Sequence, residues 1–460
     1  MKTSFNTLVM IYGVVLLVAV STWILPGGEF ERVVKDGKTM VVPGSFTVVA
    51  SQHQGIGALL VAPVKGFVQA AQIIAFLFVI GGAFAIIQRT GAIAASVQHL
   101  AESLAARPGL RVWFIPVTMI MFSLGGSVFG MCEETMPFVL IFIPLALSLG
   151  YDSIVGVAIP FLGAAAGFAG STLNPFTVGI AQSIAELPLY SGLGFRVVVW
   201  LISTTSVIVF VMRYGSYVRQ DPSRSVVHDI DQHRRETMAA SSGSSATLTT
   251  QHKLVLATFI FAIGLLVYGI LAFKWYINEI AALFLALGIV AGIVGGSSLD
   301  GMTESFREGA RDMIGVALII GCARAILVVA QDGKVLDVML YSLAAGIHHL
   351  NPILAAQTMF VAQGIINFFV HSGSGQAALT MPIMAPLADA VGLTRQTAVL
   401  AFQFGEGWIN PVLPTSGVTM GVLGLAGIPW ERWFRWMLPA QIYFLALAFL
   451  LLALAVVMLY

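Results

Sequence analysis

The chain of 460 residues is far more apolar than a soluble domain needs: 58% of it is hydrophobic and only 10% is charged. Its formal net charge of +1, with basic residues scattered along the chain, gives no field for nucleic acid, so nucleic-acid binding is excluded. We therefore expect an all-α polytopic membrane protein whose main partner is the lipid bilayer.

Membrane spans are predicted from apolar runs of about 20 residues, the length that crosses the bilayer core as a helix. Residues 1–25 could pass for a signal peptide, but no small-x-small cleavage site follows them and many spans do, so we interpret them as the first membrane helix. Full spans are expected near 7–25, 70–89, 153–187, 194–213, 254–273, 276–296, 313–331, 396–427 and 436–459.

Two apolar regions do not fit a single span. Residues 112–149 and 353–390 are each long enough for two half-depth arms, and each is interrupted by a short run rich in Gly, Ser and Thr. This pattern predicts two re-entrant helical hairpins.

One long polar segment, residues 214–252, is rich in Ser and charge and divides the chain in half. The bias of Lys and Arg between loops predicts that the N-terminus and this linker are cytoplasmic. The expected units are residues 1–213, the linker 214–252 and residues 253–460.

The two halves resemble each other at a spacing near 240 residues. The run GGAFAIIQRTG (81–91) pairs with CARAILVVAQDG (322–333), and Asn174-Pro175 pairs with Asn410-Pro411. An odd number of crossings separates equivalent elements, so two inverted repeats are predicted, each with a hairpin and a broken transmembrane helix, 153–187 in the first and 396–427 in the second.

Inverted repeats with broken helices place substrate and ion sites near the membrane midplane, where free carbonyls and half-helix ends meet. Asn-Pro inside an apolar span interrupts the helix, because Pro lacks an amide N–H and disfavours helix in the preceding residue. The candidate segments are the hairpin tips 125–135 and 371–380 and the breaks 170–179 and 408–417. The alternative is that these motifs are proline kinks and small-residue packing contacts.

Cation sites are expected where hydroxyl and amide oxygens of these segments meet, because sodium prefers several oxygen ligands. One candidate sodium site combines Ser127 with Asn174 and Thr177. Its symmetry mate combines Ser372 or Ser374 with Asn410 and Thr415.

Ionisable groups in membrane segments suggest function, although they can also join helices. Glu133 and Glu134 are adjacent, so at most one is expected to face the substrate, while Arg324 would bind a carboxylate or pair with a glutamate. A proton relay at His371 is an alternative to a plain hydrogen-bonding role. The substrate-binding candidates are Ser127, Glu133, Glu134, Asn174, Thr177, Arg324, Ser374, Gln376, Glu406, Asn410 and Thr415.

No Walker A loop, HExxH or GxSxG motif is present, so the sequence indicates neither an ATP-driven pump nor an enzyme. A gradient of sodium or protons would then supply the energy, with no other cofactor. A channel is the alternative function, since the same architecture can line a pore.

The runs GSVFGMCEETMPF, LGYDSIVGVAIPFLGAAAGFAGSTLNPFTVGIAQ, HSGSGQAALTMPIMAPLAD and QFGEGWINPVLPTSG resemble the YfcC-like branch of the C4-dicarboxylate anaerobic carrier family. The resemblance implies a place in the ion transporter superfamily, in a bacterial cytoplasmic membrane. It also implies a homodimer that moves a small-molecule substrate by an elevator-like motion. The implied substrate is a C4-dicarboxylate or an amino acid, and the alternative is arginine/ornithine exchange. The tips read Gly-Ser-Val and Ser-Gly-Ser-Gly rather than the Ser-Asn-Thr of dicarboxylate symporters, which argues against a direct transfer of dicarboxylate recognition. The paired Glu133 and Glu134 at the first tip favour a substrate that bears an amine as well as a carboxylate.

Overall fold

The computed structural model describes residues 7–35, 38–105, 108–241, 248–273 and 275–460, and helices dominate this part of the chain. The prediction of a helical membrane protein is confirmed, because eight of the described helices are long and apolar enough to cross a bilayer. These spans are Ala71–Arg89, Val112–Phe129, Leu193–Gln220, Thr250–Ile270, Ile277–Val294, Ile314–Asp332, Pro352–Phe369 and Trp430–Val457.

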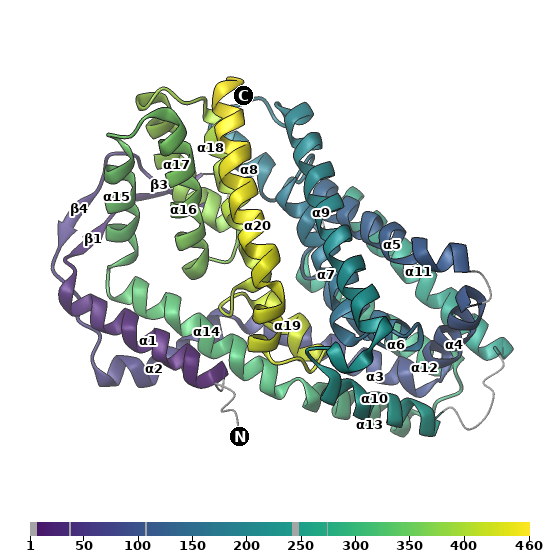
Figure 1. Ribbon diagram of the computed structural model, residues 1–460. Coiled ribbons are helices and arrows are strands. Elements are labelled where there is room, and N and C mark those ends of the chain that lie inside the picture. The colour runs from purple at the N-terminus through teal and green to yellow at the C-terminus, as the bar shows by residue number, and fades with distance from the viewer. Residues whose placement is uncertain (1–6, 36–37, 106–107, 242–247, 274) are drawn as a thin grey trace.

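A short β-structured arm follows α1 (Thr7–Ile24) and departs from the all-α prediction. It contains β1 (Gly27–Glu29), β2 (Arg32–Lys35), β3 (Lys38–Val41) and β4 (Thr47–Val49), and it leads into α2 (Ile56–Gln69). β1 pairs antiparallel with β4, and β2 with β3. The arm reaches from α1 and α2 to the second half of the chain, where β1 contacts α15 and β3 contacts α17 (Figure 1).

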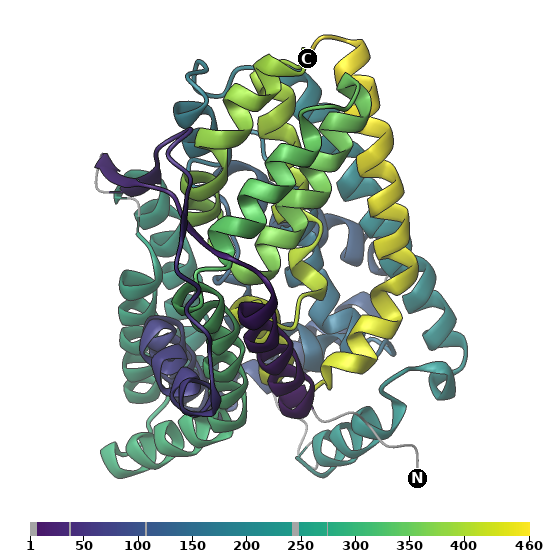
Figure 2. The same cartoon turned by 90° about the vertical axis from the view of Figure 1, so that its left-hand side faces the viewer.

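Side-chain contacts hold this arm against α15 (Leu336–Ile347). Arg32 forms an ion pair of 2.7 Å with Asp337, which also accepts a hydrogen bond of 2.9 Å from the Phe30 N–H. The rings of Phe46 and Tyr341 stack at 4.1 Å. Figure 2 shows the arm rising from α1 and α2 along the green helices of the second half.

The helices that follow occur in the same order in both halves. In the first half they are α3 (Ala71–Arg89), α4 (Ala92–Ala105), α5 (Pro108–Phe129), α6 (Thr135–Ser148), α7 (Ser153–Ala169), α8 (Val178–Ile184) and α9 (Leu193–Gln220). In the second half they are α14 (Ile314–Asp332), α15 (Leu336–Ile347), α16 (Pro352–Phe369), α17 (Gly373–Ala390), α18 (Arg395–Gly407), α19 (Gly417–Leu425) and α20 (Trp430–Val457). Between the two series lie η1 (Pro222–Arg224), α10 (His228–Ser241), α11 (Thr250–Phe273), α12 (Ile277–Val294) and α13 (Leu299–Asp312), and η2 (Asn410–Val412) interrupts the second series.

The turn after each hairpin is built in the same way. Gly150 and Gly392 both have positive φ, +84° and +74°, a conformation that glycine adopts without steric cost. Two residues later Asp152 caps α7 by accepting from the Val155 N–H, and Thr394 caps α18 by accepting from the Thr397 N–H. These local matches agree with the internal repeat seen in the sequence.

Two groups of helices can be distinguished by their packing (Figure 1). In one, which we call the α3–α14 group, α3 packs on α12 and α13, α14 packs on α1 and α2, and α11 packs on α12. In the other, the hairpin group, α7 packs on α5, α6 and α9, and α18 packs on α16, α17 and α20. The α7–α18 and α8–α17 contacts join the two halves inside the hairpin group.

Glycines allow the close approach of α5 and α7. A Cβ on Gly167 would lie 1.8 Å from the Ser123 carbonyl oxygen, and one on Gly126 would lie 2.1 Å from that of Ala164. Such contacts between small residues are a common means of helix association in lipid. The first hairpin is thereby fixed tightly to the helix that ends at the first break.

The predicted linker 214–252 is partly helical. Residues 214–220 continue α9, η1 and α10 follow, and residues 242–247 lie outside the described residues. The division of the chain at this segment stays a prediction.

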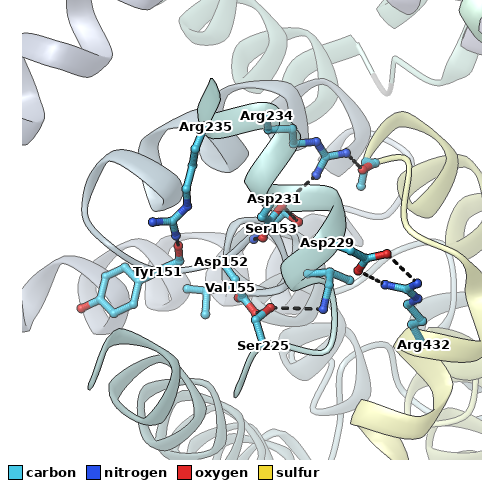
Figure 3. A network of polar contacts seen from close by, with 12 residues as sticks. Tyr151, Asp152, Ser153, Val155, Ser225, Asp229, Asp231, Arg234, Arg235 and Arg432 are labelled. Carbon is cyan, nitrogen blue, oxygen red and sulfur yellow. Dashed lines mark hydrogen bonds and ion pairs between the residues drawn. The ribbon is translucent and has the colours of Figure 1, made fainter. Parts of the chain in front are cut away.

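Helix α10 is docked by a network of polar contacts (Figure 3). Asp231 is buried and accepts hydrogen bonds from the N–H and Oγ of Ser153, at 2.7 and 2.6 Å. Arg235 donates to the Tyr151 carbonyl at 2.7 Å, and Asp229 pairs with Arg432 of α20. The hydrogen bonds from Arg432 lower the pKa of Asp229, whereas burial raises the pKa of Asp152, the residue before α7. Helix α10 thus connects the start of α7 to the start of α20.

Replacing Asp231 with alanine is expected to destabilise the protein by about 1–3 kcal/mol, because the Ser153 donors would remain buried without an acceptor. Thermal unfolding of the purified protein measures this loss. Glu236→Ala is the matched control, since Glu236 is exposed on the same helix. Equal unfolding temperatures for the two variants would contradict the docking role of Asp231.

Candidate functional site

A cavity of about 610 Å³ lies between the α3–α14 group and the hairpin group. The hairpin group contributes both hairpin tips and both helix breaks to its wall. The α3–α14 group contributes residues where α2 meets α3, residues at the start of α12, and Ile320 and Arg324 of α14. The volume is in the range of sites for small molecules.

The first hairpin tip presents two glutamates to this cavity. Helix α5 ends at Phe129, Gly130 takes a positive φ of +76°, and α6 starts at Thr135. Glu134 is turned back on the tip, where its Oε2 accepts from the Cys132 N–H at 2.8 Å. Glu133 is half-buried, and its Oε1 accepts a hydrogen bond of 3.4 Å from the Tyr276 hydroxyl. Both glutamates line the cavity.

The first break, between Ala169 and Val178, uses most of its polar groups for its own structure. Ser127 Oγ lies 2.9 Å from Thr172 Oγ1 and accepts from the Thr172 N–H at 3.1 Å. Asn174 is fully buried, and its Oδ1 accepts from the Phe176 N–H at 2.9 Å. Thr177 lines the cavity, and its Oγ1 has no hydrogen-bond partner among the described residues.

The second hairpin tip lies directly against the first break. A Cβ on Gly373 would be 2.5 Å from Cγ2 of Thr177 and 3.5 Å from Oε1 of Glu406. Ser372 caps α17 by accepting from the Gly375 N–H at 3.2 Å. His371 Nε2 lies 2.6 Å from Thr415 Oγ1, which ties this tip to the second break.

The most deeply buried carboxyl group of the cavity wall lies just before the second break. Glu406 is 2% exposed and lies in the last turn of α18. Its Oε1 accepts from Asn410 Nδ2 at 3.0 Å, while its Oε2 has no partner among the described residues. Asn367 of α16 donates to the carbonyl of Gly405 at 3.2 Å, and its own Oδ1 is also without a partner there.

Arg324 reaches the cavity from α14, on the opposite group of helices. Within the described residues, no carboxylate lies at ion-pair distance from it, and its buried Nε has no hydrogen-bond partner. A guanidinium taken out of water normally has such partners. The guanidinium of Arg324 is therefore available to an acceptor group in the cavity.

Charges of opposite sign are separated in the cavity. Glu133 lies within electrostatic range of Glu134 and Glu406, and Arg324 within range of His371. The three glutamates come from the hairpin group and Arg324 from α14, so the two signs of charge stand on opposite groups of helices. A solute with a carboxylate and an amine can complement both signs.

Most of the residues predicted for the site line this cavity, and three do not. Those that line it are Glu133, Glu134, Thr177, Arg324, Ser372, Ser374, Glu406, Asn410 and Thr415. Ser127 and Asn174 are committed to the structure of the first tip and break, and Gln376 is buried in α17, where its Nε2 donates to Oε1 of Gln363 at 2.8 Å. The assignment of binding roles to this set stays a prediction.

Sequence reasoning missed several residues of the wall: Gln69, Gln72, Phe176 and Tyr276. Tyr276 is part of a polar and aromatic interruption between α11 and α12, and Phe176 lies inside the Asn-Pro break. Phe176 could have been predicted as a wall residue, because it is an aromatic residue within a predicted helix break.

The chain matches the C4-dicarboxylate anaerobic carrier family (DcuC) over residues 5–457. It is 39% identical over 469 residues to the protein of Escherichia coli (strain K12) named "Putative basic amino acid antiporter YfcC", covering 94% of this chain and 92% of that protein. Two solved structures are more distantly similar. The YdaH transporter of Alcanivorax borkumensis has a TM-score of 0.44 and 14% identity over 98% of both chains. MtrF of Neisseria gonorrhoeae has a TM-score of 0.43 and 16% identity over 99% of this chain and 96% of that one.

Proposed function

Because the chain belongs to the C4-dicarboxylate anaerobic carrier family, we propose that it is a secondary active transporter of a small carboxylate-bearing solute. A sodium or proton gradient across the bacterial cytoplasmic membrane would drive it. The observation that carries the proposal is a cavity lined by both hairpin tips, both helix breaks and the unpaired Arg324. Broken helices persist in lipid where protein, water or a ligand satisfies the freed backbone groups.

The charges of the cavity favour an amino acid over a dicarboxylate. A C4-dicarboxylate would bring two negative charges next to Glu133, Glu134 and Glu406, whereas Arg324 is the one arginine among the described residues of the cavity wall. Like charges at close range in a low dielectric are strongly unfavourable. An amino acid places its carboxylate at Arg324 and its amino groups at the glutamates. The name of the E. coli relative, a basic amino acid antiporter, agrees with this substrate class.

An elevator-like motion fits the two groups of helices. In this proposal the hairpin group, with both tips and breaks, moves as a body against the α3–α14 group, and the two halves are inverted repeats. The cavity between the groups would then face each side of the membrane in turn. A homodimer held by the α3–α14 group is the assembly that we propose.

The coupling cation is proposed to bind near the second break. Asn410, Thr415 and Ser372 or Ser374 supply oxygens on the cavity wall, and Glu406 and Thr177 add oxygens that lack partners among the described residues. Sodium prefers such a set of hard oxygen ligands. A proton carried by Glu406 is the alternative coupling ion. We propose a second site at Thr177, Asn174 and Ser127, the symmetry mate.

Asn410→Ala is expected to weaken uptake mainly by lowering the apparent affinity for sodium, by about tenfold, the effect of one lost polar contact of about 1.4 kcal/mol. Asn174→Ala is the companion variant at the symmetry mate. Uptake into proteoliposomes as a function of sodium concentration measures both effects. If high sodium fails to restore uptake and the sodium dependence is unchanged, the cation sites are wrong.

The substrate class is tested by thermal stabilisation of the purified protein, since a ligand that binds the folded state raises its apparent stability. Dicarboxylates, monocarboxylates and amino acids are compared in sodium and in choline. Stabilisation by an amino acid that depends on sodium would support a coupled transporter of amino acids. Stabilisation by dicarboxylates alone would overturn the substrate class proposed here.

Arginine/ornithine-type exchange is the second candidate, favoured by the excess of carboxylates in the cavity. Exchange and channel conduction are separated by counterflow in proteoliposomes. A transporter accelerates entry of labelled substrate against unlabelled substrate inside, and an open pore does not. Stabilisation by basic amino acids that is indifferent to sodium would favour the exchanger.

A further inference from the structure

We propose that Tyr276, Phe176 and Glu133 form a subsite for a cationic side-chain group, an ammonium or guanidinium, and that this subsite selects basic over neutral amino acids. The inference rests on the proposed function, because it assigns a selective role to one end of the same cavity. None of these three side chains is needed to bind the substrate carboxylate, because that is the role proposed for Arg324 of α14.

The geometry brings the three side chains together around Tyr276. Its hydroxyl donates to Glu133 Oε1 at 3.4 Å, and its ring lies 6.0 Å from that of Phe176 with an interplanar angle of 30°. All three residues line the cavity. Tyr276 is 45% exposed rather than enclosed in the core, and it is part of the cavity wall.

The position of Tyr276 is fixed by the backbone. It is the residue before α12, and its N–H donates to Glu279 Oε2 at 3.1 Å. Glu133 and Phe176 come from the first hairpin tip and the first break, on the opposite group of helices. The subsite is therefore assembled across the same boundary as the cavity, so that a bound cation would touch both groups.

The chemistry of the three groups suits an organic cation. Two aromatic faces attract a positive charge through their quadrupoles, and a carboxylate supplies the opposite charge. The Glu133–Tyr276 hydrogen bond is long, and Glu133 has no ion-pair partner among the described residues, so its carboxylate is available to a ligand. A ligand side chain that ends in a methyl group would contact the aromatic rings but would not form an ion pair with Glu133.

The test uses L-lysine and L-norleucine, which differ in the terminal ammonium group alone. Affinities are measured by titrating thermal stabilisation of the full-length protein. Wild type should prefer lysine. Glu133→Gln should weaken lysine binding by about tenfold or more, the scale of a lost desolvated charge pair. Tyr276→Leu and Phe176→Leu should weaken it by about three- to tenfold, the scale of a cation–π contact. Norleucine affinity should change less than lysine affinity in all three variants.

Two further variants make the result specific. Tyr276→Phe keeps the ring and removes the hydroxyl, so it should retain most of the preference for lysine. Tyr268→Leu is the matched control, because Tyr268 is an exposed aromatic residue of α11 outside the cavity wall. The unfolding temperature without ligand shows whether each variant is folded.

The outcomes separate this inference from the proposed function. Suppose that wild type binds lysine but the variants lose affinity for lysine and norleucine equally, or for neither. The subsite is then overturned and the transporter proposal stands. If wild type binds dicarboxylates and no amino acid, both the substrate class and the subsite are overturned. If Glu133→Gln changes the sodium requirement instead of the preference for lysine, Glu133 belongs to the coupling-ion site and the subsite is again overturned.

Discussion

Replacing Arg324 with methionine is expected to lower the affinity for any carboxylate-bearing substrate by about ten- to a hundredfold, because hydrogen bonds to charged groups contribute about 1.5–3 kcal/mol. Arg324 reaches the cavity from α14, and its guanidinium has no ion-pair partner among the described residues. Methionine keeps an unbranched apolar stem, although it is shorter than arginine, and it removes the charge. Titration of ligand-induced thermal stabilisation measures the change.

The stability of the ligand-free protein separates the two roles considered for Arg324. If Arg324 binds substrate, its removal takes an unpaired charge out of a partly buried position, and the unfolding temperature should stay the same or rise. If Arg324 instead joins helices through a glutamate, the variant should unfold at a lower temperature. Arg311→Met is the control, since Arg311 is exposed on α13. Normal substrate affinity in Arg324→Met would exclude the binding role.

Long apolar runs predicted several of the full spans, but α5 and α16 were expected as half-depth arms, and Val112–Phe129 and Pro352–Phe369 are each long and apolar enough to cross a bilayer. Helices α3, α12 and α14 lie within one or two residues of the ranges expected from hydropathy. The same criterion missed α2, α4, α13 and α15, because each is shorter than a bilayer crossing and several carry polar or charged residues. The β arm was missed because its strands have three or four residues each, too few to give an alternating pattern.

The candidate site was predictable to the level of the segment, not of the side chain. Asn-Pro pairs and Gly-Ser tips mark where helices end, and the structure shows helix ends there. Asn174 illustrates the limit. Its oxygen accepts from the N–H of Phe176 two residues on, a local turn that Asn commonly makes, and its side chain is not part of the cavity wall. Tyr276 was missed because its position depends on the packing of α12 against α3, which no local pattern encodes.

Replacing Glu406 with glutamine is expected to abolish gradient-driven accumulation of substrate while leaving exchange measurable. Glu406 is 2% exposed, and its Oε2 has no partner among the described residues. A bare carboxylate is costly in such a place, so the group should carry a proton or bind a cation in each transport cycle. Glutamine has nearly the same shape but can neither take up a proton nor balance a cation charge. Uptake under an imposed gradient and counterflow in the same proteoliposomes measure the two activities.

The pattern of loss identifies the coupling ion. Glu406→Asp keeps the carboxylate and should retain part of the accumulation, and Glu304→Gln, on α13 and outside the cavity wall, should behave as wild type. If exchange by wild type requires sodium and exchange by Glu406→Gln does not, Glu406 is a sodium ligand. If the sodium requirement is the same in both, or absent in both, and the variant no longer responds to a proton gradient, Glu406 is the proton carrier. Full accumulation by Glu406→Gln would contradict either role, and the coupling site would then have to be sought among the uncharged oxygens of Thr177, Asn410 and Thr415.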